Sequence, residues 1–157
     1  LYQSFTTGEL EPFIDKHLNP IPRVKLGQIL AASGMVSAMQ DISDGIATDL
    51  AHICTQSGVG AEVRADRLPG ADALEKVCRN INRAAVDLQL SGGEDYELLF
   101  TVKKGKDEEL LAVLKDRCGE KVYRVGRTVP GDTVRLISAE GSLDIGFKGY
   151  QHTGSDS

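Results

Sequence analysis

The sequence lacks several patterns by which common protein classes are identified. Its three cysteines, Cys54, Cys78 and Cys118, are widely spaced and form no CxxC pair. This spacing argues against a disulfide framework and a zinc site, and it favours a reducing compartment. No cluster of Lys or Arg stands out among 18 basic and 23 acidic residues, and the formal net charge is −5. Nucleic acids and other polyanions are therefore not expected as partners.

Long apolar runs and targeting signals are also missing. No stretch approaches the ~20 apolar residues that span a bilayer. The first residues, "LYQSFTTGELEPF", do not have the basic and then apolar layout of a signal peptide. We therefore expect a cytoplasmic protein without membrane association. The chain does not begin with Met and opens on a pattern typical of the interior of a protein, so we expect it to be part of a longer one.

The length and composition indicate one compact domain. A chain of 157 residues with 41% hydrophobic residues can bury a single core of ordinary size. Residues 1–150 are expected to form this domain, and residues 151–157 a frayed tail. The expected class is α+β, with about six strands and four to five helices. The pattern predicts strands in residues 35–42, 59–68, 98–102, 121–129, 133–138 and 143–150. It predicts helices in residues 6–20, 21–34, 46–57 and 106–119, and one helix or two helices with a break near Asn80 in residues 71–89.

Two acids lie close together in the stretch "DISDG", at the predicted turn from a strand to a helix. This placement can project the carboxylates of Asp41 and Asp44 into one cleft. With the hydroxyl of Ser43 they offer the hard oxygen ligands that Mg²⁺ prefers. Gly45 and the start of the following helix suit a phosphate, which the free amide groups there attract. The alternative is that these side chains only cap the helix, a role that Asp and Ser often have.

A second glycine-rich turn, "SGGEDYE", precedes the apolar strand expected at residues 98–102. Its glycines permit a sharp turn, and Glu94, Asp95 or Glu97 could face a ligand at the mouth of the strand. The alternative is a glycine turn flanked by solvated acids.

Other polar residues carry weaker signals. Asp49 and His52 lie on the predicted polar face of the 46–57 helix, where Asp49 is a solvated or structural acid and His52 is more often solvated than a base. Tyr150 could stack on a ring or pack on the core. Three isolated arginines could meet phosphates, although such residues usually lie on the surface: Arg23, Arg124 and Arg127.

No Ser/His/Asp set, Walker-type GxxxxGK[ST] or GxGxxG motif is visible. Local chemistry alone therefore predicts a site for Mg²⁺ and phosphate without naming a reaction. However, the segments "PIPRVKLGQILA", "MQDISDGIATDLAHICTQSGVGAEV" and "LSGGEDYELLFTV", in this order, resemble the thiamine-monophosphate kinase family. This family belongs to the superfamily of aminoimidazole ribonucleotide synthetase (AIR synthase). The resemblance corresponds to the C-terminal domain only, so the N-terminal domain with most metal ligands and much of the ATP site would be absent from this chain.

The resemblance implies a fold, a reaction and a set of site residues. The fold would be a three-layer α/β/α domain with a mixed sheet. The full-length protein would be a homodimer that transfers the γ-phosphoryl group of ATP to thiamine monophosphate, and the fragment alone would be inactive. By position, Asp41 and Asp44 would bind Mg²⁺ and Ser43 would contact ATP phosphate. Glu94 would bind the thiamine moiety, and Tyr150 would stack on its pyrimidine ring.

Two other functions stay open. In "GYQHTG", Gln151 and Thr153 replace the acid and the aromatic residue that are usual in the family. A different ATP-dependent member of the superfamily, with another substrate, is therefore one alternative. The other is a non-catalytic ligand-binding domain of the same fold, in which the acidic turns are only structural.

Overall fold

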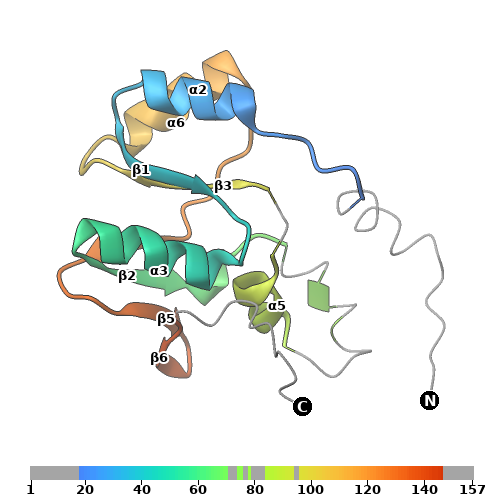
Figure 1. Ribbon diagram of the computed structural model, residues 1–157, viewed down its shortest axis with the longest axis vertical. Helices are drawn as coiled ribbons and strands as arrows, with labels where there is room; N and C mark the ends of the chain where they lie inside the picture. The colour runs from blue at the N-terminus through green and yellow to red at the C-terminus, as the bar shows by residue number, and fades with distance from the viewer. Residues whose placement is uncertain (1–17, 71–73, 76–77, 79–83, 94–95, 147–157) are drawn as a thin grey trace, which may run out of the picture.

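The computed structural model describes residues 18–70, 74–75, 78, 84–93 and 96–146. Its helices and strands are interspersed up to α6, and three consecutive strands follow, in an α+β arrangement (Figure 1). The described helices are α2 (Val24–Ala32), α3 (Ile46–Ser57), the 3₁₀ turn η1 (Ala65–Arg67), α5 (Ala85–Ser91) and α6 (Asp107–Arg117). The described strands are β1 (Val36–Asp41), β2 (Gly60–Arg64), β3 (Leu98–Val102), β4 (Gly126–Val129), β5 (Val134–Ser138) and β6 (Gly141–Asp144).

The six strands form two sheets. Strands β1 and β3 pair antiparallel, and the other four are ordered β4-β2-β5-β6. In the larger sheet β2 and β5 are parallel, whereas the β2–β4 and β5–β6 pairs are antiparallel. The predicted α+β class, with six strands and a mixed sheet, is confirmed. The strands are divided between two sheets because α3 is inserted between them.

The layers follow from the two apolar clusters of the described residues. Helices α2 and α6 pack on one face of the β1–β3 pair, through a cluster that includes Leu30, Leu110 and Leu114. Helix α3 covers the other face of that pair and also packs on β2 and β5 (Figure 1). The predicted α/β/α layering is therefore present around β1 and β3, with the four-stranded sheet beyond α3.

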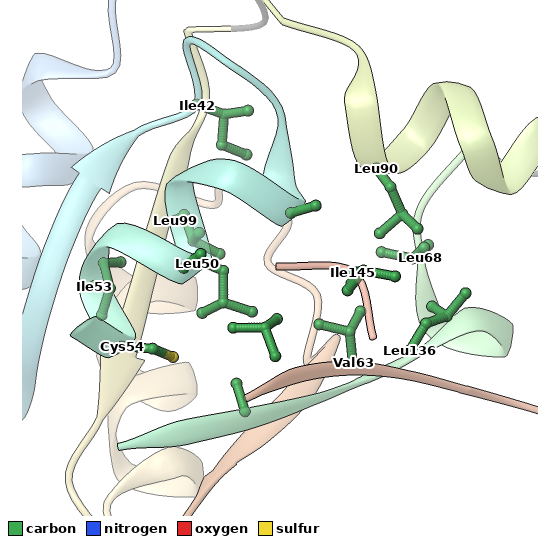
Figure 2. Packing of buried hydrophobic residues seen from close by; sticks show 14 residues of the cluster. Ile42, Leu50, Ile53, Cys54, Val63, Leu68, Leu90, Leu99, Leu136 and Ile145 are labelled. Atoms are coloured by element: carbon green, nitrogen blue, oxygen red, sulfur yellow. The ribbon is translucent and has the colours of Figure 1, made fainter. Parts of the chain in front are cut away.

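Helix α3 is the centre of the larger cluster (Figure 2). Its buried residues face two directions, so that Leu50 and Ile53 lie near Leu99 of β3 while the helix also faces Val63 of β2. A helix that is apolar on most of its circumference is typical of a position between two layers. This position fixes the N-terminal end of α3 next to the C-terminal end of β1.

The ends of the helices follow the residues that the sequence supplies. Helix α3 ends at Gly58, which adopts the left-handed conformation with φ 64°. Helix α6 has acids in its first turn and Lys115 and Arg117 in its last, as the helix dipole favours. In the part of the chain that the structure describes, none of the helices has the length and apolar character needed to cross a membrane.

Candidate functional site

The "DISDG" segment connects β1 to α3 and exposes three polar side chains. Asp41 is the last residue of β1, and Ser43 and Asp44 follow it in the turn. All three are exposed, whereas Ile42 between them is only 7% exposed and belongs to the core around α3 (Figure 2). Burial of Ile42 therefore anchors the turn, while the predicted metal and phosphate ligands project from it.

The N-terminus of α3 is not capped by these side chains. Its N-cap residue is Gly45, with φ 102° and ψ 151°, and no side chain makes a cap hydrogen bond there. The conformation is one that only glycine adopts readily. The capping interpretation of Asp41, Ser43 and Asp44 is therefore wrong for this helix, and their side chains remain available to a ligand.

Asp49 has the structural role instead. Its side chain is only 2% exposed, and its Oδ2 accepts hydrogen bonds from the amides of Ser43 at 3.0 Å and Asp44 at 3.1 Å. The backbone oxygen of Asp49 also accepts a hydrogen bond from Nε2 of Gln40 at 2.9 Å. Of the two roles left open for Asp49, the structural one is confirmed, and its placement on a solvent-facing polar side is wrong.

This arrangement limits which amides could bind the predicted phosphate. The amides of Ser43 and Asp44 point at Asp49 and are therefore not free for a phosphate. A phosphate at this end of α3 would use the amides of its first turn, which have no partner within a helix.

The second motif lies directly against the first. The amide of Ile42 donates to the backbone oxygen of Glu97 at 2.8 Å, and the amide of Tyr96 donates to the backbone oxygen of Ile42 at 3.1 Å. A Cβ added to Gly93 would collide with the backbone oxygen of Ser43, and one added to Gly45 would lie 2.7 Å from the oxygen of Leu90. Two segments far apart in the sequence thus form one surface, because glycines allow their backbones to approach.

The backbone of this surface is strained at one residue. Tyr96 has φ 50°, and it is the one non-glycine residue with a positive φ among the described residues. Such strain persists only where the surrounding structure enforces it, and it is concentrated at functional sites. Glu94, and with it Asp95, lies outside the described residues, as does Tyr150 near the C-terminal end.

Arg23 holds the second motif in place. Its Nη2 and Nε atoms contact the two carboxylate oxygens of Glu97 at 2.8 and 2.9 Å, and its Nη1 lies 3.5 Å from Glu120. The hydrogen bond to Glu97 is the main cause that raises the pKa of the Arg23 guanidinium above its ordinary value. Both Arg23 and Glu97 are therefore engaged with each other, and the structure gives them a positioning role.

The other predicted phosphate ligands lie elsewhere. Arg124 pairs with Asp107 at 3.0 Å, and Arg127 pairs with Glu62 at 2.7 Å. Both arginines line a hollow of about 300 Å³ on the larger sheet, and neither acidic motif contributes to its lining. The hollow is therefore distinct from the surface that the two motifs form. His52 is exposed on α3, as predicted.

Comparison with known proteins identifies the family. Residues 7–138 match the family model described as AIR synthase related protein, C-terminal domain. The chain belongs to this family. The AIR synthase related domain is 48% identical over 142 residues to the thiamine-monophosphate kinase of Salmonella typhimurium, an alignment that covers 88% of this chain and 42% of the relative.

Solved structures agree with this assignment. The thiamine-monophosphate kinase of Stenotrophomonas maltophilia superposes with a TM-score of 0.72 at 35% identity, covering 85% of this chain and 41% of the other. The structure described as AaThiL complexed with AMPPCP and TMP has a TM-score of 0.67 at 25% identity, covering 91% and 43%. The AIR synthase related domain thus spans less than half the length of each of these relatives.

The acidic turn of the domain suits one side of a magnesium site. Asp41 and Asp44 are exposed carboxylates three positions apart, and Mg²⁺ in phosphate-transfer sites typically takes one or two carboxylates with water and phosphate. Over the described residues, no group of three or more His, Cys, Asp or Glu side chains is placed to hold a metal. The two carboxylates of the turn therefore fit part of a Mg²⁺ shell that water and phosphate would complete.

Proposed function

We propose that this AIR synthase related domain is the C-terminal part of a kinase that transfers the γ-phosphoryl group of ATP to thiamine monophosphate. The products would be thiamine diphosphate and ADP. The observation that carries the proposal is the surface formed by the two acidic motifs, on which Asp41, Ser43 and Asp44 are exposed instead of capping α3. The similarity to thiamine-monophosphate kinases supports the choice of reaction.

Each exposed residue has a role in this proposal. Asp41 and Asp44 would hold Mg²⁺, which when bound neutralises charge on the phosphates. Ser43 would contact ATP phosphate, and Glu94 and Tyr150 would bind the thiamine moiety. The structure of AaThiL with AMPPCP and TMP supports a site for two such ligands on this fold. No protein nucleophile is required, because phosphoryl transfer depends mainly on alignment and electrostatic stabilisation.

The domain would act together with the part of the relatives that it does not cover. We propose that residues 1–150 form the C-terminal domain of a protein with an N-terminal ATP- and metal-binding domain. We further propose that this protein is a cytoplasmic homodimer. The partial donor set of the acidic turn supports this division, since two carboxylates leave most of a Mg²⁺ shell to other ligands. The chain alone is then inactive.

A chimera tests the proposal directly. In it, the C-terminal portion of the Salmonella typhimurium enzyme that aligns with this chain is replaced by this chain, which is 48% identical to it. The purified chimera is assayed for conversion of thiamine monophosphate to thiamine diphosphate with ATP and Mg²⁺. We expect ADP and thiamine diphosphate to form in equal amounts.

The controls separate a wrong function from a failed chimera. Circular dichroism and binding of AMPPCP establish that the chimera is folded and takes up nucleotide. A folded chimera that binds AMPPCP but does not phosphorylate thiamine monophosphate would refute the proposed reaction. Turnover of a different phosphate or amine in a substrate panel would then favour another ATP-dependent member of the superfamily. A chimera that is folded by circular dichroism but binds neither Mg²⁺ nor AMPPCP would favour the non-catalytic domain.

A further inference from the structure

Asp49 is a buried carboxylate whose hydrogen-bond partners lie on the functional turn. Its side chain is 2% exposed, and an ion that is removed from water requires strong compensating partners. Its hydrogen bonds come from the amides of Ser43 and Asp44, and none of the ion pairs among the described residues includes Asp49. The carboxylate is therefore compensated by the backbone that carries the ligand side chains.

A single oxygen makes both contacts. Oδ2 lies 3.0 Å from the amide nitrogen of Ser43 and 3.1 Å from that of Asp44, so the two consecutive amides converge on one point. Hydrogen bonds to an ionised carboxylate are stronger than those between neutral groups. Because these amides are drawn inward, the side chains of Ser43 and Asp44 are left on the exposed side of the turn.

The same helix position is tied to β1 as well. Gln40 donates its Nε2 hydrogen to the backbone oxygen of Asp49 at 2.9 Å, one residue before the predicted metal ligand Asp41. Asp49 of α3 is thus hydrogen-bonded to β1 through its backbone oxygen and to the turn through its side chain. A carboxylate that served only α3 would bond the amides of that helix, and this one bonds residues that precede it.

We infer that Asp49 is a positioning residue that fixes the backbone of the acidic turn before any ligand binds, and so sets the direction of Asp41 and Asp44 toward the cation. The catalytic part of this inference rests on the proposed kinase function, whereas the fixed turn does not. Metal ligands that are already fixed in place lose little conformational entropy when the cation binds.

Amide hydrogen exchange of the 157-residue chain, followed by NMR, tests the fixed turn. We expect the amides of Ser43 and Asp44 to be protected in the native chain. Asp49→Ala is expected to accelerate their exchange at least about tenfold relative to that of Ile42, as loss of hydrogen bonds to a charged group would. Asp49→Asn keeps one acceptor oxygen in the same place and is expected to have a smaller effect.

Ile53→Val is the matched control, since Ile53 is a buried residue of the same helix, 5% exposed, and packs in the core cluster. It is expected to change the exchange of Ser43, Asp44 and Ile42 by a common factor. If the Asp49→Ala variant does not fold, the native chain and Asp49→Asn decide the question. Unprotected Ser43 and Asp44 amides in the native chain would overturn the inference, as would an Asp49→Ala variant in which they stay protected.

The chimera provides a second readout that stability alone would not move. Asp49→Ala is expected to raise the Mg²⁺ concentration at half-maximal rate several-fold, and Asp49→Asn to restore part of the loss. If an active chimera shows no such shift, the positioning role in catalysis is refuted while the kinase function stands. If the chimera is inactive but the exchange pattern is found, the proposed reaction is refuted and Asp49 still fixes the turn.

Discussion

Replacement of Gly45 by alanine tests whether the two acidic motifs meet as described. Gly45 has φ 102° and ψ 151°, a region that costs a non-glycine residue about 1–3 kcal/mol. The added Cβ would also lie 2.7 Å from the oxygen of Leu90 and 3.0 Å from backbone carbons of Ser91. Relieving such overlap with backbone atoms costs about 1–3 kcal/mol more. Together these terms predict a loss of about 2–6 kcal/mol in the free energy of unfolding.

Gly58→Ala is the matched control, because Gly58 lies at the other end of the same helix. It has φ 64°, yet an added Cβ would find nothing within 4 Å. Its expected cost is only the strain of a left-handed residue, about 1–2 kcal/mol. The strain of the two backbones has a similar expected cost, so a larger loss in Gly45→Ala reports the contact between the motifs.

Urea unfolding of the chain, followed by circular dichroism, measures both variants. With a slope of about 2 kcal/mol per molar urea, Gly45→Ala is expected to lower the midpoint by about 1–3 M. A Gly45→Ala variant no less stable than Gly58→Ala would refute the reasoning, since it would mean that the backbone of residues 90–91 does not lie against Gly45.

The remaining predictions concern the metal site, the ion pair and a buried thiol. In the chimera, Asp44→Asn is expected to lower the phosphotransfer rate about 100-fold or more. Asp116→Asn, at an exposed position of α6, is expected to leave the rate unchanged. Full activity of the Asp44 variant would contradict the metal role. The chain alone is expected to bind Mg²⁺ weakly by calorimetry, and a tight stoichiometric titration would oppose the shared-site model. Arg23→Lys keeps the charge but loses the two-pronged contact with Glu97, so urea unfolding should show a loss of about 0.5–1.5 kcal/mol, and an unchanged midpoint would contradict this. Burial raises the pKa of the Cys54 thiol, so the contribution of the protonated thiol to stability is present below the ordinary thiol pKa and is lost as pH rises through the raised pKa. The melting temperature of the native chain should therefore fall more at alkaline pH than that of Cys54→Ala. Parallel curves of melting temperature against pH for the two proteins would contradict this prediction.

The elements with a clear period or strong end signals were predictable from the sequence. The 46–57 helix was predicted within its observed bounds, because Leu50 and Ile53 recur at helical spacing and Gly58 follows. The apolar run 98–102 coincides with β3. The strand predicted from residue 121 begins only at Gly126, and the last hydrogen bond to β2 on that side is the one that the amide of Arg64 donates to the backbone oxygen of Val125 at 2.8 Å. The predictions for residues 6–17 and for Glu94 and Tyr150 lie outside the described residues.

The role of Asp49 could not be predicted, although its identity and helix position were visible. A helical pattern shows which residues share a face but not what covers that face. Here the first turn of α3 is covered by its own incoming turn, whose amides replace water around the carboxylate. Likewise, local preference favoured Asp and Ser as caps, but Gly45 took the cap position because the segment at Leu90 leaves no room for a side chain.

The pairing of β1 with β3 determines when the site can form during folding. Asp41 pairs with Leu98, and the chain between them includes α3, β2 and α5. Closing so long a segment carries an entropic cost that local helix formation does not, so this pair is expected to form late. A partly folded chain could then retain α3, and most of its helical signal, while Ser43 and Gly93 are still apart. Ligand binding would therefore report the last step of folding, and circular dichroism would overestimate the fraction of competent molecules.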